Sequence, residues 1–270
     1  MANTYIGVNG VAQQAKKIYV GVNGIARNVK SIYVGVYGVA RNVYSNSGAA
    51  NPDDYFDPNT HIATEANFIA FLEAGGKYDD TSLIGYKVTL SNSATYNGGT
   101  YVIADVNHDS TNTGQTNCYD LIALDCVNPG ISFGSNYNWR DSNVRTWLNG
   151  TFYNGLSSDI KSHIINIKYN SQGTWYNDDK VILPSFTEVN GSTGTSYPQY
   201  ADIEGIAYPI FTNNNSRSKY QFGTTSTYYW WTRSRYAVGS GTVWRVVADG
   251  SLNNNGCTSK RYVVPTLRIS

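Results

Sequence analysis

Nine residues near the C-terminal end, YYWWTRSRY at residues 228–236, contain five aromatic side chains and two arginines. Successive side chains of a β-strand point to opposite faces of the sheet, so Trp230 and Trp231 cannot both belong to the core on one side. We therefore expect one of the two tryptophans to anchor a sheet. Arg233 is expected to hold a carbonyl or carboxylate inside, and Arg235, Tyr236 and the loop beyond them are expected to lie outside. The stretch is predicted to serve both as core and as surface.

The sequence before this stretch predicts short helices and strands in alternation. The segment TEANFIAFLEAGG (residues 64–76) has Thr64 as a helix cap, an apolar side and two terminal glycines, which is typical of a short helix. Two further short helices are predicted within residues 139–169, the first capped by Asp141 or Ser142 and the second by Ser157 or Ser158. Strand-like runs occupy residues 83–91, 99–107, 118–127, 179–184, 228–234, 243–252 and 261–270. Helices followed by a sheet-rich end predict an α+β domain with short helices and a C-terminal antiparallel sheet.

The first 44 residues repeat with a period of 14, as YIGVNGVAQQAKKI, YVGVNGIARNVKSI and YVGVYGVARNVY. Asn9-Gly10 and Asn23-Gly24 are typical of two-residue hairpin turns, and Tyr37-Gly38 takes their place in the third unit. One such hairpin cannot bury a core, so the units are expected to stack on one another or on other chains. We predict three β-hairpin repeats for attachment or oligomerisation at residues 1–44, a linker at 45–61, and the main domain at 62–270.

The overall composition excludes several classes of partner. The formal net charge is +1, and charged residues form only 14% of the chain, so no bulk field draws it to nucleic acid. The sequence has no apolar run of membrane-spanning length, so we expect no membrane insertion. It also has no basic-then-apolar leader, so we expect the chain to be made in the cytoplasm without a cleaved signal peptide. Abundant tyrosine (23) and glycine (26) suit a β-rich binding protein and equally a fibrous tail protein.

Several short motifs in order resemble a domain of Firmicutes proteins and their phages. They are WRDSNVRTWLNGTFYNGLSSDIKSHI, DKVILPS, YYWWTRS, VWRVVADGSL and VVPTLRIS, and the resemblance that they carry covers roughly residues 62–270. The usual closing strand of that domain reads V-R-P-A-L, and Val264 replaces its arginine here. The hairpin repeats also resemble segments of tail and baseplate-associated proteins of Gram-positive phages and prophages. The domain is similar to the C-type-lectin-like fold of formylglycine-generating enzymes and of the variable proteins of diversity-generating retroelements.

This resemblance implies a receptor-binding (adhesin) protein of a phage or prophage tail, in the virion or outside the cell. Its expected partners are a bacterial cell-surface receptor, glycan or protein, and other tail proteins that contact the N-terminal repeats, with a homo-oligomer as the assembly. Two rival hypotheses remain open. In the first, the chain is a purely structural tail protein whose aromatic residues pack between subunits. In the second, it is an enzyme on a formylglycine-generating-type scaffold, although the sequence offers no thiol pair for that chemistry.

The resemblance also implies a ligand surface in the C-terminal residues, without a catalytic group. Aromatic rings stack on sugars or apolar groups, and Asn and Arg supply directed hydrogen bonds. The predicted ligand-binding residues are Arg235, Tyr236, Ser240, Thr242, Arg245, Asn253, Asn254, Asn255, Thr258 and Lys260.

We expect no metal and no cofactor. Asp105, Asn107 and Asp109 match the opening of a calcium loop, but Ser110 replaces its glycine and Thr116 its bidentate glutamate, so a polar turn is the favoured interpretation. The three cysteines Cys118, Cys126 and Cys257 form no CxxC pair and are interpreted as buried thiols.

Overall fold

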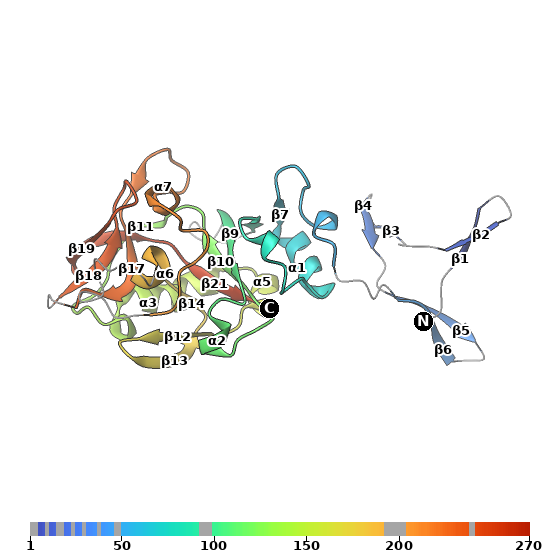
Figure 1. Cartoon of the computed structure of the whole chain (residues 1–270), viewed down its shortest axis with the longest axis horizontal. Coiled ribbons are helices and arrows are strands. Elements are labelled where there is room, and N and C mark those ends of the chain that lie inside the picture. The colour runs from blue at the N-terminus through green and yellow to red at the C-terminus, as the bar shows by residue number, and fades with distance from the viewer. Residues whose placement is uncertain are drawn as a thin grey trace. The chain divides into compact units, whose positions relative to one another are not determined.

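The computed structural model describes residues 50–91, 99–191, 204–237 and 241–270, together with the backbone of six short strands between residues 5 and 45. The chain divides into two compact units, both drawn in Figure 1. The first comprises Met1–Asn51 and Ala74–Gly76, and the second comprises Pro52–Glu73 and Lys77–Ser270.

The backbone of the first unit forms three antiparallel pairs, one in each sequence repeat. Each pair is a two-stranded sheet of its own. The predicted turn dipeptides Asn9-Gly10, Asn23-Gly24 and Tyr37-Gly38 lie outside the described residues. Because a lone two-stranded hairpin is marginally stable in water, each repeat needs a further surface to pack against. The strands are β1 (Tyr5–Val8), β2 (Val11–Gln14), β3 (Tyr19–Val22), β4 (Ile25–Asn28), β5 (Ser31–Val36) and β6 (Val39–Ser45).

The larger sheet of the second unit has six strands in the order β14-β21-β10-β9-β8-β7. Its β7–β8 pair is parallel and its other pairs are antiparallel. All five residues of β10 are buried, and its Leu121 pairs with Ile103 on one side and Leu267 on the other. The last strand of the chain therefore lies inside the core sheet (Figure 1). The strands are β7 (Ile62–Thr64), β8 (Lys87–Leu90), β9 (Gly99–Val106), β10 (Tyr119–Ala123), β14 (Val181–Ile182) and β21 (Thr266–Ile269).

The second sheet has five strands in the order β11-β20-β17-β18-β19. It is mixed, because β17 pairs in parallel with β20 at Trp230 and Tyr262, and this corrects the predicted all-antiparallel C-terminal sheet. The final run 261–270 also divides between the two sheets at Pro265, which has no N–H to donate to a strand ladder. The strands are β11 (Val127–Ser132), β17 (Trp230–Arg235), β18 (Thr242–Val246), β19 (Leu252–Gly256) and β20 (Lys260–Val263).

Short helices and two small hairpins connect the sheets. The hairpins are β12 (Ile167–Ser171) with β13 (Thr174–Asp179), and β15 (Lys219–Tyr220) with β16 (Thr227–Tyr228). The helices and helical turns are η1 (Pro52–Asp54), α1 (Glu65–Glu73), η2 (Thr81–Leu83), α2 (Ser110–Thr113), η3 (Trp139–Asp141), α3 (Asn143–Trp147), the π-helical turn η4 (Leu148–Phe152), α4 (Tyr153–Gly155), α5 (Ser158–His163), α6 (Phe186–Asn190) and α7 (Asn214–Arg217).

The sequence correctly predicted the ends of several helices. Thr64 accepts a hydrogen bond from the backbone N–H of Asn67, as a helix cap does, and Gly75 beyond the end of α1 has a φ of 103°. Ser142 accepts from the N–H of Arg145 at the start of α3, and Ser157 accepts from that of Ile160 at the start of α5. Each cap residue fixes where its helix begins, because it accepts a hydrogen bond from an N–H that has no partner inside the helix.

Trp230 and Trp231 are both fully buried, on opposite faces of β17, whereas the sequence led us to expect one anchor. The indole Nε1 of Trp230 donates to the carbonyl of Arg217 (3.1 Å), and that of Trp231 donates to the carbonyl of Ile131 (3.0 Å). Trp231 also meets the ring of Phe133 edge-on. β17 is the central strand of this sheet, and both faces of the sheet are covered there. Side chains on both faces of β17 therefore belong to the core.

The second unit is thus an α+β arrangement of short helices and two mixed sheets. Within the described residues, none of the helices is long and apolar enough to cross a membrane.

Candidate ligand-binding face

The structure brings three of the predicted ligand-binding residues together on β18 and β19. In the antiparallel register Arg245 pairs with Asn253, and Val243 pairs with Asn255. Directly paired residues project from the same face of a sheet, so Arg245, Asn253 and Asn255 share one side, which we call the Arg245 face. Arg245 Nη1 donates a hydrogen bond to Oδ1 of Asn255 at 3.4 Å. Asn253 is exposed, and the other two are partly exposed.

Three other predicted residues belong with Trp244, whose side chain points to the opposite face. Asn254 pairs with Trp244, and Thr242 lies two residues before it on β18. The ring of Tyr236 meets that of Trp244 edge-on, with centroids 5.1 Å apart. Trp244 is itself buried against Phe186, at a centroid distance of 4.3 Å. Tyr236 therefore packs against Trp244, and Asn254 projects from the face opposite the Arg245 face.

The remaining predicted residues that the structure describes lie at strand ends and in a connecting turn. Arg235 ends β17, and its guanidinium carbon lies 6.0 Å from the centre of the Tyr137 ring. Thr258 and Lys260 are exposed, between β19 and the start of β20. Ser240 lies outside the described residues.

Two residues that the sequence did not single out complete the Arg245 face. The guanidinium carbon of Arg245 lies 4.7 Å from the ring centre of Tyr229, and that of Arg261 lies 5.4 Å from the same ring. Tyr229 immediately precedes β17, which lies between β18 and β20 in the sheet, so the ring has one arginine-bearing strand on each side. We call Tyr229, Arg245 and Arg261 the arginine–tyrosine cluster. Its members come from β18, from β20 and from the residue that precedes β17, and no spacing in the sequence relates them.

The arginine–tyrosine cluster carries positive charge without a carboxylate counterpart. In the described part of the chain, neither Arg245 nor Arg261 forms an ion pair with Asp or Glu. The Nε atoms of both are buried and have no hydrogen-bond partner there. Burial lowers the pKa of Arg245, and the nearby positive charge of Arg261 lowers it further. The charge of Arg261 therefore disfavours the charge of Arg245, and a bound anion would offset this repulsion.

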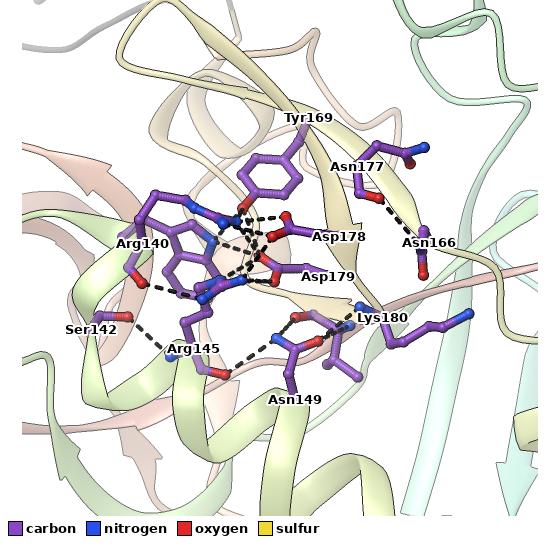
Figure 2. A network of polar contacts seen from close by, with 12 residues as sticks. Arg140, Ser142, Arg145, Asn149, Asn166, Tyr169, Asn177, Asp178, Asp179 and Lys180 are labelled. Atoms are coloured by element: carbon purple, nitrogen blue, oxygen red, sulfur yellow. Dashed lines mark hydrogen bonds and ion pairs between the residues drawn. The ribbon is translucent and has the colours of Figure 1, made fainter.

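A second set of arginines, shown in Figure 2, has the opposite electrostatic character. Arg140 donates from both terminal nitrogens to the two oxygens of Asp178, each at 2.6 Å. Arg145 donates from Nε to Oδ1 of Asp179 at 2.7 Å. The hydrogen bonds from Arg140 hold the pKa of Asp178 below its usual value. We call Arg140, Arg145, Asp178 and Asp179 the paired-arginine network.

The paired-arginine network fastens the hairpin β12–β13 to the helical segment η3–α3. The side chain of Asp179 is fully buried, and it also accepts from the indole of Trp139 (3.1 Å) and the hydroxyl of Tyr169 (2.6 Å). Below it, Oδ1 of Asn149 accepts from the N–H of Lys180 (2.7 Å), while its amide donates to the carbonyl of Val181 (2.9 Å). Because its donors and acceptors satisfy one another, this network is a structural fastening rather than an open site.

Two buried ion pairs stabilise the core of the second unit. Arg233 donates to the two carboxylate oxygens of Glu188 at 2.6 and 2.7 Å and to the carbonyl of Leu183, which confirms its predicted structural role. Arg268 on β21 donates to the two oxygens of Asp120 on the neighbouring β10, at 2.6 and 2.8 Å. Removal of one partner from either pair would leave an uncompensated buried charge.

The segment DVNHDS forms a turn with its own polar contacts. Asp105 Oδ2 lies 2.8 Å from Nδ1 of His108, and Oδ1 of Asn107 accepts from the N–H of Cys118. Asp109 accepts from the side-chain amide of Asn112. Among the described residues, no group of three or more His, Cys, Asp and Glu side chains is arranged to hold a metal ion.

The three cysteines are free and buried. Burial raises the pKa of the Cys118 thiol to about 12, and it raises the pKa of Cys126 as well. A thiol with a raised pKa stays protonated at neutral pH and is a poor nucleophile and a poor metal ligand.

Comparison with known families identifies one match. The family described as a domain of unknown function, DUF6273, matches residues 123–270, which is more than half of the chain and includes both the Arg245 face and the paired-arginine network. No curated protein and no solved structure matches the chain.

Proposed function

We propose that this chain, which belongs to the DUF6273 family, is a receptor-binding protein of a phage or prophage tail and that the Arg245 face carries its ligand surface. The observation that supports the proposal is the convergence of Tyr229, Arg245 and Arg261 on a partly exposed sheet face beside two asparagines. Such side chains offer ring surface and directed donors to a ligand.

The mechanism of this function is reversible recognition without a chemical step. The thiols Cys118 and Cys126 are held protonated by burial and are poorly suited to covalent or copper chemistry. The resemblance of the motif order to C-type-lectin-like domains supports a binding role on a stable sheet scaffold. We infer that fold for residues 62–270, and the α+β arrangement with a C-terminal sheet is compatible with it.

The N-terminal repeats are proposed to attach the chain to other tail proteins and to join copies into a homo-oligomer. Each repeat is a two-stranded sheet, and such a sheet gains stability by packing against another surface. Several copies held together would raise the avidity for a cell-surface receptor even where each contact is weak. The location that follows from this proposal is the virion tail.

The test is binding of the intact protein to Gram-positive cells. We expect R245A/N253A/N255A, which removes three side chains of the Arg245 face, to lower cell binding at least tenfold. The control is W175A, because Trp175 is 42% exposed on β13, which belongs to a different sheet. It should bind within twofold of the unmodified protein, and both variants should unfold at a similar temperature.

Two outcomes would contradict the proposal. Equal binding by R245A/N253A/N255A and by the unmodified protein would place recognition elsewhere on the chain. If instead no cell binds the protein, and R245A/N253A/N255A impairs assembly of the tail, the surface is a subunit contact and the chain is a structural tail protein.

A further inference from the structure

The arginine–tyrosine cluster has more hydrogen-bonding capacity than the described protein uses. A guanidinium has five N–H donors. Arg245 makes one bond, at 3.4 Å to Asn255, and Arg261 makes one bond, from Nη1 to the carbonyl of Lys260 at 2.6 Å. By contrast, Arg140 makes three hydrogen bonds with Asp178 and Tyr169 alone. The cluster therefore holds donors that a ligand with acceptor oxygens would satisfy.

The ring of Tyr229 holds the two cations in place. A guanidinium over an aromatic ring is attracted to its face, and this contact orders the long side chain before any ligand arrives. The planar edge of the guanidinium remains able to donate to two oxygens of one phosphate or carboxylate. Tyr229 itself is 39% exposed, so the cluster is open to solvent.

A third positively charged residue lies close to the cluster in the sequence. The exposed Lys260 immediately precedes Arg261 in β20, and no carboxylate of the described residues pairs with either arginine. Two like charges beside one ring repel each other. A bound anion, or another favourable interaction, would offset this repulsion. Asn253 and Asn255 on the same face supply amide groups suited to hydroxyl groups beside the anion.

We propose that Arg245 and Arg261, ordered on Tyr229, form a binding site for the phosphate or carboxylate groups of an anionic cell-surface polymer. This inference rests on the function proposed above and names the chemical class of its ligand. Lys260 adds long-range attraction, and Asn253 and Asn255 contact the uncharged part of the polymer. Affinity at this site falls as salt rises, because exposed charges are screened.

The experiment measures binding of the full chain to three purified polymers of similar length by calorimetric titration. The probes are oligo(glycerol phosphate), oligogalacturonate and neutral dextran. We expect an anionic probe to bind, dextran to bind at least tenfold more weakly, and R245Q/R261Q to lose at least tenfold in affinity for the anionic probe. The preferred probe identifies the anion as phosphate or carboxylate. Raising salt from 50 to 500 mM should weaken binding severalfold.

The matched control is K161Q/K168Q. It also removes two positive charges, but from α5 and β12 rather than from the cluster. It should retain affinity within twofold, which separates a local site from the effect of net charge. R245K/R261K keeps the charge and loses the planar fork, so an intermediate affinity is expected. Because Arg245 and Arg261 pair with no carboxylate of the described residues, R245Q/R261Q should fold with an unchanged unfolding midpoint.

The inference is overturned if no anionic probe binds, if dextran binds as well as the anionic probes, or if R245Q/R261Q binds like the unmodified protein. If the intact protein still binds cells through the Arg245 face under those outcomes, the function stands and the ligand is not an anionic polymer. If an anionic polymer binds at the cluster and no cell does, the site stands and the receptor-binding function fails.

Discussion

The paired-arginine network and the arginine–tyrosine cluster each contain two arginines beside a tyrosine, yet their chemistry is opposite. Arg140 and Arg145 face two aspartates, and their donors are met inside the protein. Arg245 and Arg261 face an aromatic ring, and no carboxylate of the described residues pairs with them. The comparison indicates that an arginine matched by carboxylates supports the fold, whereas an arginine matched only by a ring remains able to bind.

The largest effect is expected where the paired-arginine network is broken at its buried carboxylate. In D179A the donors of Trp139, Tyr169 and Arg145 lose their shared acceptor, so the free energy of unfolding should fall by about 3–5 kcal/mol. Urea titration would measure it. The control is D79A, an exposed aspartate, which should change the free energy by less than about 0.5 kcal/mol. A loss below about 1 kcal/mol in D179A would contradict the structural role.

Lys219 sharpens the comparison, because it is a cation that is almost fully buried. Burial lowers its pKa from its ordinary 10.5 to about 8. Between these two values the unfolded chain binds the proton and the folded chain does not, so stability rises with pH across that window. Relative to K219M, the unfolding free energy of the unmodified protein should increase by about 3 kcal/mol from pH 7.5 to 10.5. Urea titrations of both proteins across this range would measure the difference.

The prediction for Lys219 has a clear contrary result. A pH-independent difference between K219M and the unmodified protein would mean that Lys219 keeps its proton in the folded state. A carboxylate would then have to compensate its charge, and Asp125 is the acidic neighbour that acts on its pKa.

A smaller effect separates the two sets of arginines directly. R245Q should leave the unfolding free energy unchanged or raise it by up to about 1 kcal/mol, because it removes a like-charge contact with Arg261. R140Q should lower it by about 1–2 kcal/mol, because Asp178 loses two hydrogen bonds and the hydroxyl of Tyr169 loses a third. Unfolding of both in urea provides the measurement. If R245Q is as destabilising as R140Q, Arg245 has a structural role that its described contacts do not explain.

The smallest effect is expected in the pH dependence of stability, where the Arg140–Asp178 pair is lost in acid. Arg140 lowers the pKa of Asp178 in the folded state, so the contribution is present above the unfolded pKa of about 3.9 and is lost as pH falls through the lower folded pKa. Asp178 is half exposed, so the contribution should stay below about 1 kcal/mol. The stability difference between D178N and the unmodified protein, measured from pH 6 to 2, should shrink toward the acid end. A constant difference would contradict it.

Much of the local structure was predictable because its causes are local. The caps Thr64, Ser142 and Ser157 act within three residues of the N–H groups that they satisfy, so the sequence shows both partners. Arg233 was correctly predicted to hold a carboxylate or carbonyl, since a buried arginine that follows two core tryptophans along a strand needs an internal acceptor. The identity of that acceptor, Glu188, was not predictable.

The candidate site was predictable only in part. The sequence indicated Arg245, Asn253 and Asn255, and alternation along the strands is enough to place them on one face once β18 and β19 are paired. The resemblance assigned Tyr236 and Asn254 to the same surface, but the ring of Tyr236 contacts Trp244, and the register places Asn254 on the Trp244 side of the sheet. Tyr229 and Arg261 were missed, because their relation to Arg245 depends on strand order rather than on spacing.

By itself, the sequence determined the hairpin-forming repeats, the helix caps, the strand-rich C-terminal end and an approximate set of surface residues, since these follow from neighbours along the chain. Tertiary structure alone decided that β17 lies between β18 and β20, with a parallel neighbour on one side. That order places two arginines beside Tyr229, while the helical segment η3–α3 places two others against Asp178 and Asp179. An arginine that lies beside carboxylates stabilises the fold, whereas one without a carboxylate neighbour stays available to a ligand. Contacts between segments that are distant in the sequence decide which of these neighbours an arginine has.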